Sequence, residues 1–118
     1  MALHNELGKN GEVLAVAWLQ KQGYQVVCTN WRYGRLEIDV IALKDNLPHF
    51  VEVKYKTSGQ FGPPELKVNK QKFRNIANAA AGWLRRNPQH RDFRIDVLAI
   101  TELRGKEPEY FLIRNVFL

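Results

Sequence analysis

The sequence predicts a single α/β domain in which helices flank a mixed sheet, in the order helix, strand, strand, strand, helix, strand, strand. Apolar residues recur at helical spacing in two segments, and five other segments are rich in β-branched and aromatic residues. A strand, a helix and a strand follow one another between residues 50 and 98, as in a right-handed parallel crossover. The length of 118 residues suits one hydrophobic core, so we expect one domain over residues 1–118.

Composition and charge narrow the class of protein. The apolar content of 45% and the charged content of 25% are those of an ordinary soluble domain. A formal charge of +6 favours an anionic partner, nucleic acid ahead of a membrane. The single cysteine, Cys28, allows no internal disulfide, and no segment resembles a signal peptide or a membrane span. We therefore expect a cytoplasmic protein.

The first helix is predicted over residues 6–22, with Asn5 as its N-cap and Gly23 as its end. Gly11 weakens a helix, so close backbone approach is the expected reason for it. Glu12 borders the buried stripe and is either a solvated residue or a further carboxylate directed at the sheet. The expected stripe consists of Leu7, Gly11, Leu14, Ala15, Trp18 and Leu19.

The first strand is predicted over residues 24–31, and residues 30–35 connect it to a hairpin. Arg32 and Arg35 in this connection are candidates for contacts with phosphate, although exposed loop arginines are common.

The hairpin places charged residues of two strands together. Asp45 and Asn46 tolerate a positive φ and suit a two-residue turn, which sets Asp39 across from Glu52 and Glu37 across from Lys54. Alternation puts Glu37 with Asp39 on one face. The other face is expected to carry Ile38, Val40 and Ala42 from the first strand, and Val51, Val53 and Tyr55 from the second.

Two interpretations of this hairpin remain open from spacing alone. Opposed carboxylates repel, so Asp39 and Glu52 favour a proton or a hard divalent ion between them, with Lys54 pointing the same way. Alternatively, Glu37 and Lys54 form a cross-strand ion pair, and the inward charges protect a sheet edge.

The loop over residues 57–67 contains two glycines and two prolines and is either a substrate-facing flap or a plain connection. The second helix is predicted from the N-cap Asn69 to Arg86. Lys70 faces solvent, whereas Lys72 lies at the border of the apolar stripe and is expected to reach the charged face of the sheet. The stripe is Phe73, Ile76, Ala77, Ala80, Trp83 and Leu84. Further cations suited to contacts with a nucleic-acid backbone are Lys67, Arg74, Arg85, Arg86 and Arg91.

The last two strands are predicted over residues 93–103 and 110–116. The final strand is apolar, so it is an expected edge or homodimer surface.

Element order and motifs together resemble the restriction-endonuclease-like core of the PD-(D/E)XK nucleases. Within that superfamily the chain resembles the YraN-like family of small predicted bacterial endonucleases, which is similar to archaeal Holliday-junction resolvases. The residues that carry the resemblance are Gly11, Glu12, Ala15, Ala17, Leu19, Gly23, Tyr24, residues 30–32, 37–42 and 50–54, Phe61, Gly62, Lys72, Ile76, Ala80, Leu84 and residues 94–97.

The resemblance implies a role for each matching residue. It implies Asp39, Glu52 and the Val53 carbonyl as ligands of Mg²⁺ or Mn²⁺, and Lys54 as the group that positions the attacking water. Glu12 would complete the acidic site and Lys72 would contact substrate phosphate. The sequence departs from the pattern at Leu36, where Gly is usual, and at Lys56, where Arg is usual; Lys56 keeps the charge for a nucleic-acid contact. Asp96 also matches the pattern, and we interpret it as structural.

We therefore expect a metal-dependent nuclease that hydrolyses phosphodiester bonds in DNA, with branched or structured DNA as the implied substrate. One alternative is a nucleic-acid-binding module on a nuclease fold without catalytic activity. Another is a protein-interaction domain that uses the apolar last strand.

Overall fold

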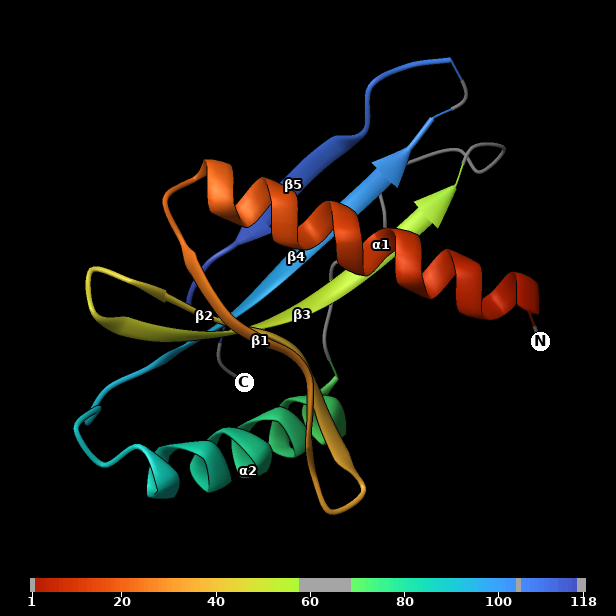
Figure 1. Cartoon of the computed structure of the whole chain (residues 1–118). Coiled ribbons are helices and arrows are strands. Elements are labelled where there is room, and N and C mark those ends of the chain that lie inside the picture. The colour runs from red at the N-terminus through yellow and green to blue at the C-terminus, as the bar shows by residue number, and fades with distance from the viewer. Residues whose placement is uncertain (1, 58–68, 104, 117–118) are drawn as a thin grey trace.

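A computed structural model describes residues 2–57, 69–103 and 105–116, with side chains described from Asn10 onward. The observed order of helices and strands is the predicted one (Figure 1). The elements are α1 (Ala2–Lys21), β1 (Gln25–Tyr33), β2 (Leu36–Lys44), β3 (Leu47–Thr57), α2 (Lys70–Arg86), β4 (Arg94–Glu102) and β5 (Glu109–Ile113).

The five strands form one mixed sheet in the order β1-β2-β3-β4-β5. Only β3 and β4 are parallel, and α2 connects them as the predicted crossover. The helices α1 and α2 cover opposite faces of the sheet (Figure 1). Each helix packs against its own apolar cluster, so every central strand is covered on both sides. No helix of the described residues is long and apolar enough to cross a membrane.

The first helix begins earlier than predicted. It runs from Ala2, so Asn5 lies within the helix and is not its N-cap. Its end is as expected, because Gly23 has φ +93°. The close approach expected at Gly11 is confirmed, since a Cβ there would lie 3.0 Å from Cβ of Tyr55 on β3. The buried stripe is confirmed from Gly11 to Leu19, and Leu7 lies outside the described side chains.

The second helix matches its predicted bounds. Asn69 is the N-cap, and its side-chain oxygen accepts a hydrogen bond of 2.7 Å from the backbone N–H of Lys72. The predicted stripe packs into the cluster that α2 shares with Ile38, Ile41 and Phe50 of the sheet. The helix therefore presents a fixed face to the sheet, and its first turn has a defined position.

The β2–β3 hairpin has the predicted turn and register. Asp45 has φ 52° and Asn46 has φ 62°, as a two-residue turn of this kind requires. The strands pair from Lys44 with Leu47 to Val40 with Val51. Beyond that pair β2 parts from β3, and the β1–β2 hairpin bends toward α2 while β3 and β4 continue together (Figure 1).

This fork overturns two sequence-based expectations. Ile38 packs in the cluster beneath α2, whereas Val40 and Ala42 pack beneath α1, so these three residues do not share a face. Glu37 lies across from Arg32 of β1, with 3.6 Å between Arg32 Nε and Glu37 Oε2, and so is not set opposite Lys54. Strand alternation fails here because β2 changes direction where its ladder with β3 ends.

Smaller differences concern strand ends. The first strand extends to Tyr33, so Arg32 belongs to β1 and only Arg35 lies in the connecting turn. The last strand ends at Ile113, three residues before its predicted end. The predicted loop over residues 57–67 lies outside the described residues after Thr57.

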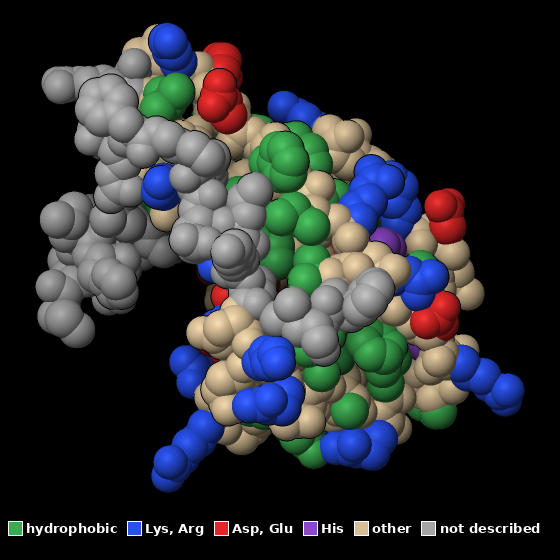
Figure 2. Space-filling view, turned by 180° about the vertical axis from the view of Figure 1, so that it is seen from behind, with side chains coloured by type: hydrophobic (Ala, Val, Ile, Leu, Met, Phe, Trp, Pro, Cys, Tyr) green, Lys and Arg blue, Asp and Glu red, His purple; other side chains and the backbone are tan. Residues whose placement is uncertain are grey.

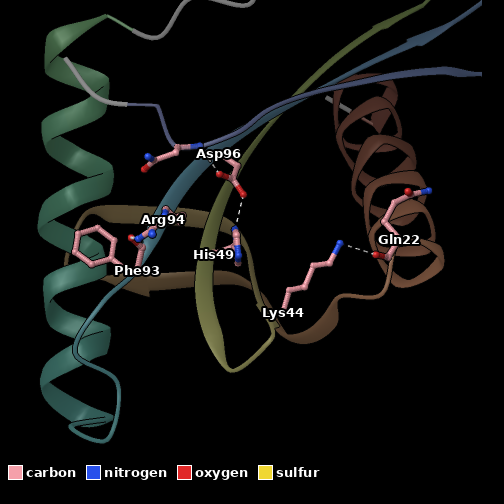
Figure 3. A network of polar contacts seen from close by, with 7 residues as sticks. Gln22, Lys44, His49, Phe93, Arg94 and Asp96 are labelled. Atoms are coloured by element: carbon pink, nitrogen blue, oxygen red, sulfur yellow. Dashed lines mark hydrogen bonds and ion pairs between the residues drawn. The ribbon is translucent and has the colours of Figure 1, made fainter.

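A buried polar contact joins β3, β4 and the chain after β5. Asp96 is fully buried; its Oδ2 lies 2.7 Å from Nδ1 of His49, and its Oδ1 accepts a hydrogen bond of 2.8 Å from the backbone N–H of Asn115 (Figure 3). Nearby, Lys44 Nζ donates to the carbonyl of Gln22 at 3.0 Å and so binds the end of α1 to the hairpin. Asp96 thus has the structural position that the sequence suggested.

We predict that Asp96→Ala lowers the free energy of unfolding by about 3 kcal/mol, because it leaves a buried histidine and a backbone N–H without their partner. Chemical denaturation measures the change. The exposed carboxylate of Asp92 is the control, and Asp92→Ala should leave the transition midpoint nearly unchanged. An Asp96→Ala protein as stable as the parent contradicts this role.

Candidate active site

The two carboxylates singled out by the sequence meet at the fork between β2 and β3. Asp39 directly precedes Val40, the residue at which the pairing of β2 with β3 ends, and its Oδ2 accepts a hydrogen bond of 2.8 Å from the backbone N–H of Val53. The ladder between β2 and β3 has ended at this point. The Asp39 carboxylate therefore accepts the Val53 N–H, which a backbone carbonyl of β2 would accept in a continued ladder. Glu52 is the next residue of β3 before Val53, is 9% exposed, and forms a hydrogen bond with Asp39.

The contact between these carboxyl groups changes the acidity of Asp39. Burial, the charge of Glu52 and the hydrogen bond with Glu52 raise the pKa of Asp39 from 3.8 to about 7, against opposing contributions from the Val53 N–H and Lys72. Near neutral pH the pair therefore holds one proton for part of the time. The two carboxyl groups together offer four oxygens and one removable proton. A cation can therefore take the place of that proton.

Lys72 reaches this pair from α2, as predicted. Its Nζ lies 3.1 Å from Glu52 Oε2, and the side chains are 47% and 11% exposed respectively. The N-cap Asn69 fixes the backbone of Lys72 by accepting its N–H. One end of Lys72 is thus held by the helix cap, while its ammonium group remains partly open to solvent next to the buried carboxylates.

Lys54 and Lys56 follow Glu52 along β3 and are half-buried. They lie across from Ala99 and Thr101 of β4, in an unbroken parallel ladder. Val53 and Tyr55 pack on the α1 side, so alternation places Lys54 and Lys56 on the same face as Glu52. The predicted line of a carboxylate followed by two ammonium groups is therefore present on one face of β3.

Glu12 of α1 contacts a residue of β1 that lies next to the carboxylate pair. Its Oε2 accepts a hydrogen bond of 2.6 Å from Nδ2 of Asn30. On either side of Asn30, Thr29 pairs with Val40 and Trp31 pairs with Ile38. Asn30 therefore lies opposite Asp39. Sequence reasoning missed Asn30, whose φ of 52° is unusual within a strand. Glu12 thus contacts the residue opposite Asp39, and its part in the chemistry stays a prediction.

The remaining predicted contact residues lie apart from the carboxylates. Lys70 is exposed at the start of α2. Arg32 and Arg35 are exposed at the end of the β1–β2 hairpin, where Arg32 pairs with Glu37. These cations surround the site at a distance and do not enter it.

The donors at the fork fit a hard divalent cation. Asp39 and Glu52 offer carboxylate oxygens, which Mg²⁺ and Mn²⁺ prefer. Burial and the charge of Glu52 raise the pKa of Asp39, and a cation beside the pair would offset both effects. Among the described side chains, which are those of residues 10–57, 69–103 and 105–116, no group of three His, Cys, Asp or Glu is close enough to hold a metal ion. An ion here would take one or two carboxylates, and water or substrate would supply the rest, as is usual for Mg²⁺.

Comparison with known proteins places these residues in a family. A profile described as uncharacterised protein family UPF0102 matches residues 11–100, a range that includes Glu12, Asp39, Glu52 and Lys72.

Individual relatives are similar over nearly the whole chain. A UPF0102 protein of Geobacter metallireducens is 42% identical over 119 residues, which cover 99% of this chain and 97% of the relative. The UPF0102 protein FP2501 of Flavobacterium psychrophilum is 40% identical over 104 residues, covering 88% and 87%. A relative from Leifsonia xyli is 34% identical over 110 residues, covering 92% and 93%.

The raised pKa of Asp39 predicts how stability depends on pH. The folded chain keeps a proton that the unfolded chain loses above pH 3.8, so this contribution is complete below that value and is lost as pH rises through about 7. We expect the unfolding midpoint of the metal-free protein to fall between pH 5 and pH 8, and Asp39→Asn to remove much of that fall.

Thermal unfolding in a chelating buffer tests this. Asp92→Asn is the control, because contacts with Arg94 and the Phe93 N–H lower the pKa of Asp92 and keep it ionised over this range. If the unfolding midpoint falls with pH by the same amount in the parent and in Asp39→Asn, the two carboxyl groups do not share a proton.

Proposed function

The chain belongs to the uncharacterised protein family UPF0102, and from the carboxylate pair in its sheet we propose that it is a metal-dependent nuclease of the PD-(D/E)XK type. The proposed reaction is hydrolysis of phosphodiester bonds in DNA, with Mg²⁺ or Mn²⁺ as cofactor. The observation that carries the proposal is the contact between Asp39 and Glu52 at the point where β2 leaves β3.

The chain's own residues have distinct roles in this proposal. Asp39 and Glu52 hold the ion, and the backbone carbonyl of Val53 is the third protein oxygen. When bound, the ion supplies charge that polarises the phosphate and favours ionisation of the attacking water. Lys54, two residues beyond Glu52 on the same face, positions that water and offsets negative charge as it develops.

Lys72 links the site to the substrate. It pairs with Glu52 across 3.1 Å, and its side chain is 47% exposed, so it is accessible to a phosphate. The formal charge of +6 supports an anionic polymer as substrate. Branched or structured DNA is proposed from the resemblance to junction resolvases, and the location is proposed to be the cytoplasm.

The second candidate is a nucleic-acid-binding module without catalysis. It is favoured by the lack of a third acidic ligand among the described residues and by the ion pair that Lys72 forms with Glu52. Both readings predict salt-dependent DNA binding, and only the nuclease predicts cleavage that requires a divalent ion.

We predict that Asp39→Asn and Glu52→Gln each lower the rate of Mn²⁺-dependent cleavage by at least about a thousandfold, because each removes a carboxylate that holds the ion. Linear, flapped and four-way DNA with Mg²⁺, Mn²⁺ or a chelator measure the cleavage, and calorimetry measures Mn²⁺ binding.

The matched control is Glu37→Gln, which removes a carboxylate of the same strand that pairs with Arg32. It should cleave like the parent. Undiminished cleavage by both site variants contradicts the assignment, whereas DNA binding by the parent with no cleavage under any metal condition supports the binding module.

We also predict that Lys72→Ala weakens DNA binding and reduces the slope of log affinity against log salt by about one, since one phosphate contact is lost. Sequence preference should not change. Lys21→Ala removes an equal charge at the end of α1 and should leave the slope unchanged. The same slope for Lys72→Ala and the parent rules out the phosphate contact.

A further inference from the structure

An aromatic and cationic cluster lies where the β1–β2 hairpin meets the end of α2. The rings of Trp31 and Tyr33 stack with centroids 5.9 Å apart and planes within 10°. The guanidinium carbon of Arg86 lies 5.9 Å from the Trp31 ring centroid, and that of Arg85 lies 5.6 Å from the Tyr33 ring. Arg85 also donates a hydrogen bond to the Tyr33 hydroxyl. We call Trp31, Tyr33, Arg85 and Arg86 the ring cluster.

The ring cluster is built into the fold. Gly82 allows Tyr33 to lie directly on α2, since a Cβ at Gly82 would be 2.5 Å from the ring. Trp31 and Tyr33 are two residues apart on the edge strand β1 and point to the same face. Both rings are half-buried, whereas Arg85 and Arg86 are exposed. The aromatic surface is therefore rigid and partly accessible, and a guanidinium group lies over each of its rings.

The helix that carries this cluster has an unbalanced charge. α2 contains five basic residues and no acidic one, and it includes Lys70 and Lys72 in its first turn. Cations are unfavourable there, because the N-terminal end of a helix is already positive. Lys and Arg side chains spread over the end of the molecule formed by α2 (Figure 2). The cations of the first turn do not serve helix stability, whereas Arg85 and Arg86 in the last turn suit the negative end of the helix. The uniform positive charge along α2 suits an anionic polymer.

The helix α2 carries cations at both of its ends. Lys72, which contacts Glu52, and Arg85 of the ring cluster are 13 positions apart in the helix. At 1.5 Å per residue this is about 20 Å. Between them Arg74 is also exposed. A nucleic acid strand that lies along α2 would therefore span about six nucleotides at the duplex spacing of 3.4 Å.

We propose that the ring cluster binds unpaired nucleotides of a nucleic acid strand, with bases stacking on Trp31 and Tyr33 and phosphates contacting Arg85 and Arg86. Unpaired bases bind to flat aromatic surfaces with nearby guanidinium groups, because every base has a face that stacks on an aromatic ring. A paired base has no free face of this kind. The inference rests on the proposed nuclease function, for which it defines the substrate as a strand with unpaired bases near the cut.

The test is binding of fluorescently labelled 12-nucleotide strands to the full chain in low salt with a chelator, so that cleavage plays no part. The probes are oligo-dT, oligo-U, an abasic strand of equal charge and a DNA duplex. The parent should bind oligo-dT about tenfold more tightly than the abasic strand. Trp31→Leu should abolish that preference, and Trp31→Phe should retain most of it.

Arg85→Gln combined with Arg86→Gln should weaken oligo-dT binding about tenfold and reduce its salt dependence. The matched control is Lys21→Gln combined with Lys106→Gln, which removes the same charge from exposed positions outside α2 and should change binding less than threefold. Thermal unfolding checks that each variant folds. The arginine variant tests the proposal independently if Trp31→Leu does not fold, because both arginine side chains are exposed.

Equal binding of oligo-dT and the abasic strand by the parent overturns the proposal, as does equal weakening by the two double variants. Polyglutamate binding with the same dependence on Trp31 also overturns it, in favour of an acidic protein partner. Oligo-U binding equal to oligo-dT supports base stacking with either sugar. The binding assay runs in a chelator and does not depend on cleavage. Intact binding by a parent protein that does not cleave therefore counts against the nuclease and not against the ring cluster.

Discussion

The structure depends on the parting of β2 from β3 after Val40 and Val51. A sheet that stayed paired would have satisfied the Val53 N–H with a strand carbonyl, whereas here the Asp39 carboxylate accepts it. That hydrogen bond holds Asp39 against β3 next to Glu52. Two acidic groups are then close together, and burial and the charge of Glu52 raise the pKa of Asp39. The fork is therefore both the feature that bends the sheet and the feature that assembles the candidate site.

Local chemistry explains why much of this could be predicted from the sequence. Asp45 and Asn46 determine the turn, and the turn determines the register that brings Asp39 level with Glu52. The cap at Asn69 likewise determines where α2 starts and so where Lys72 lies. In each case a few neighbouring residues decide the geometry, and that information is present in a single sequence.

What the sequence did not reveal depends on contacts between distant elements. Nothing local signals that the ladder ends at Val40, so the face of Ile38 and the cross-strand partner of Glu37 were predicted wrongly. The left-handed Asn30 and its hydrogen bond with Glu12 join residues 18 positions apart. The contacts of Tyr33 with Gly82 and Arg85 join the first hairpin to the far end of α2. The helix α1 begins at Ala2 and not at the predicted residue 6, because Asn5 can cap a helix and can also lie inside one.

Anomalous scattering from crystals soaked in Mn²⁺ tests most directly whether Asp39 and Glu52 share one divalent cation. We expect a single strong peak at the fork, within about 2.2 Å of a carboxylate oxygen of each residue. A map with Lys72 still paired to Glu52 and no peak between the two carboxylates, at a Mn²⁺ concentration that supports DNA cleavage, would contradict a shared cation.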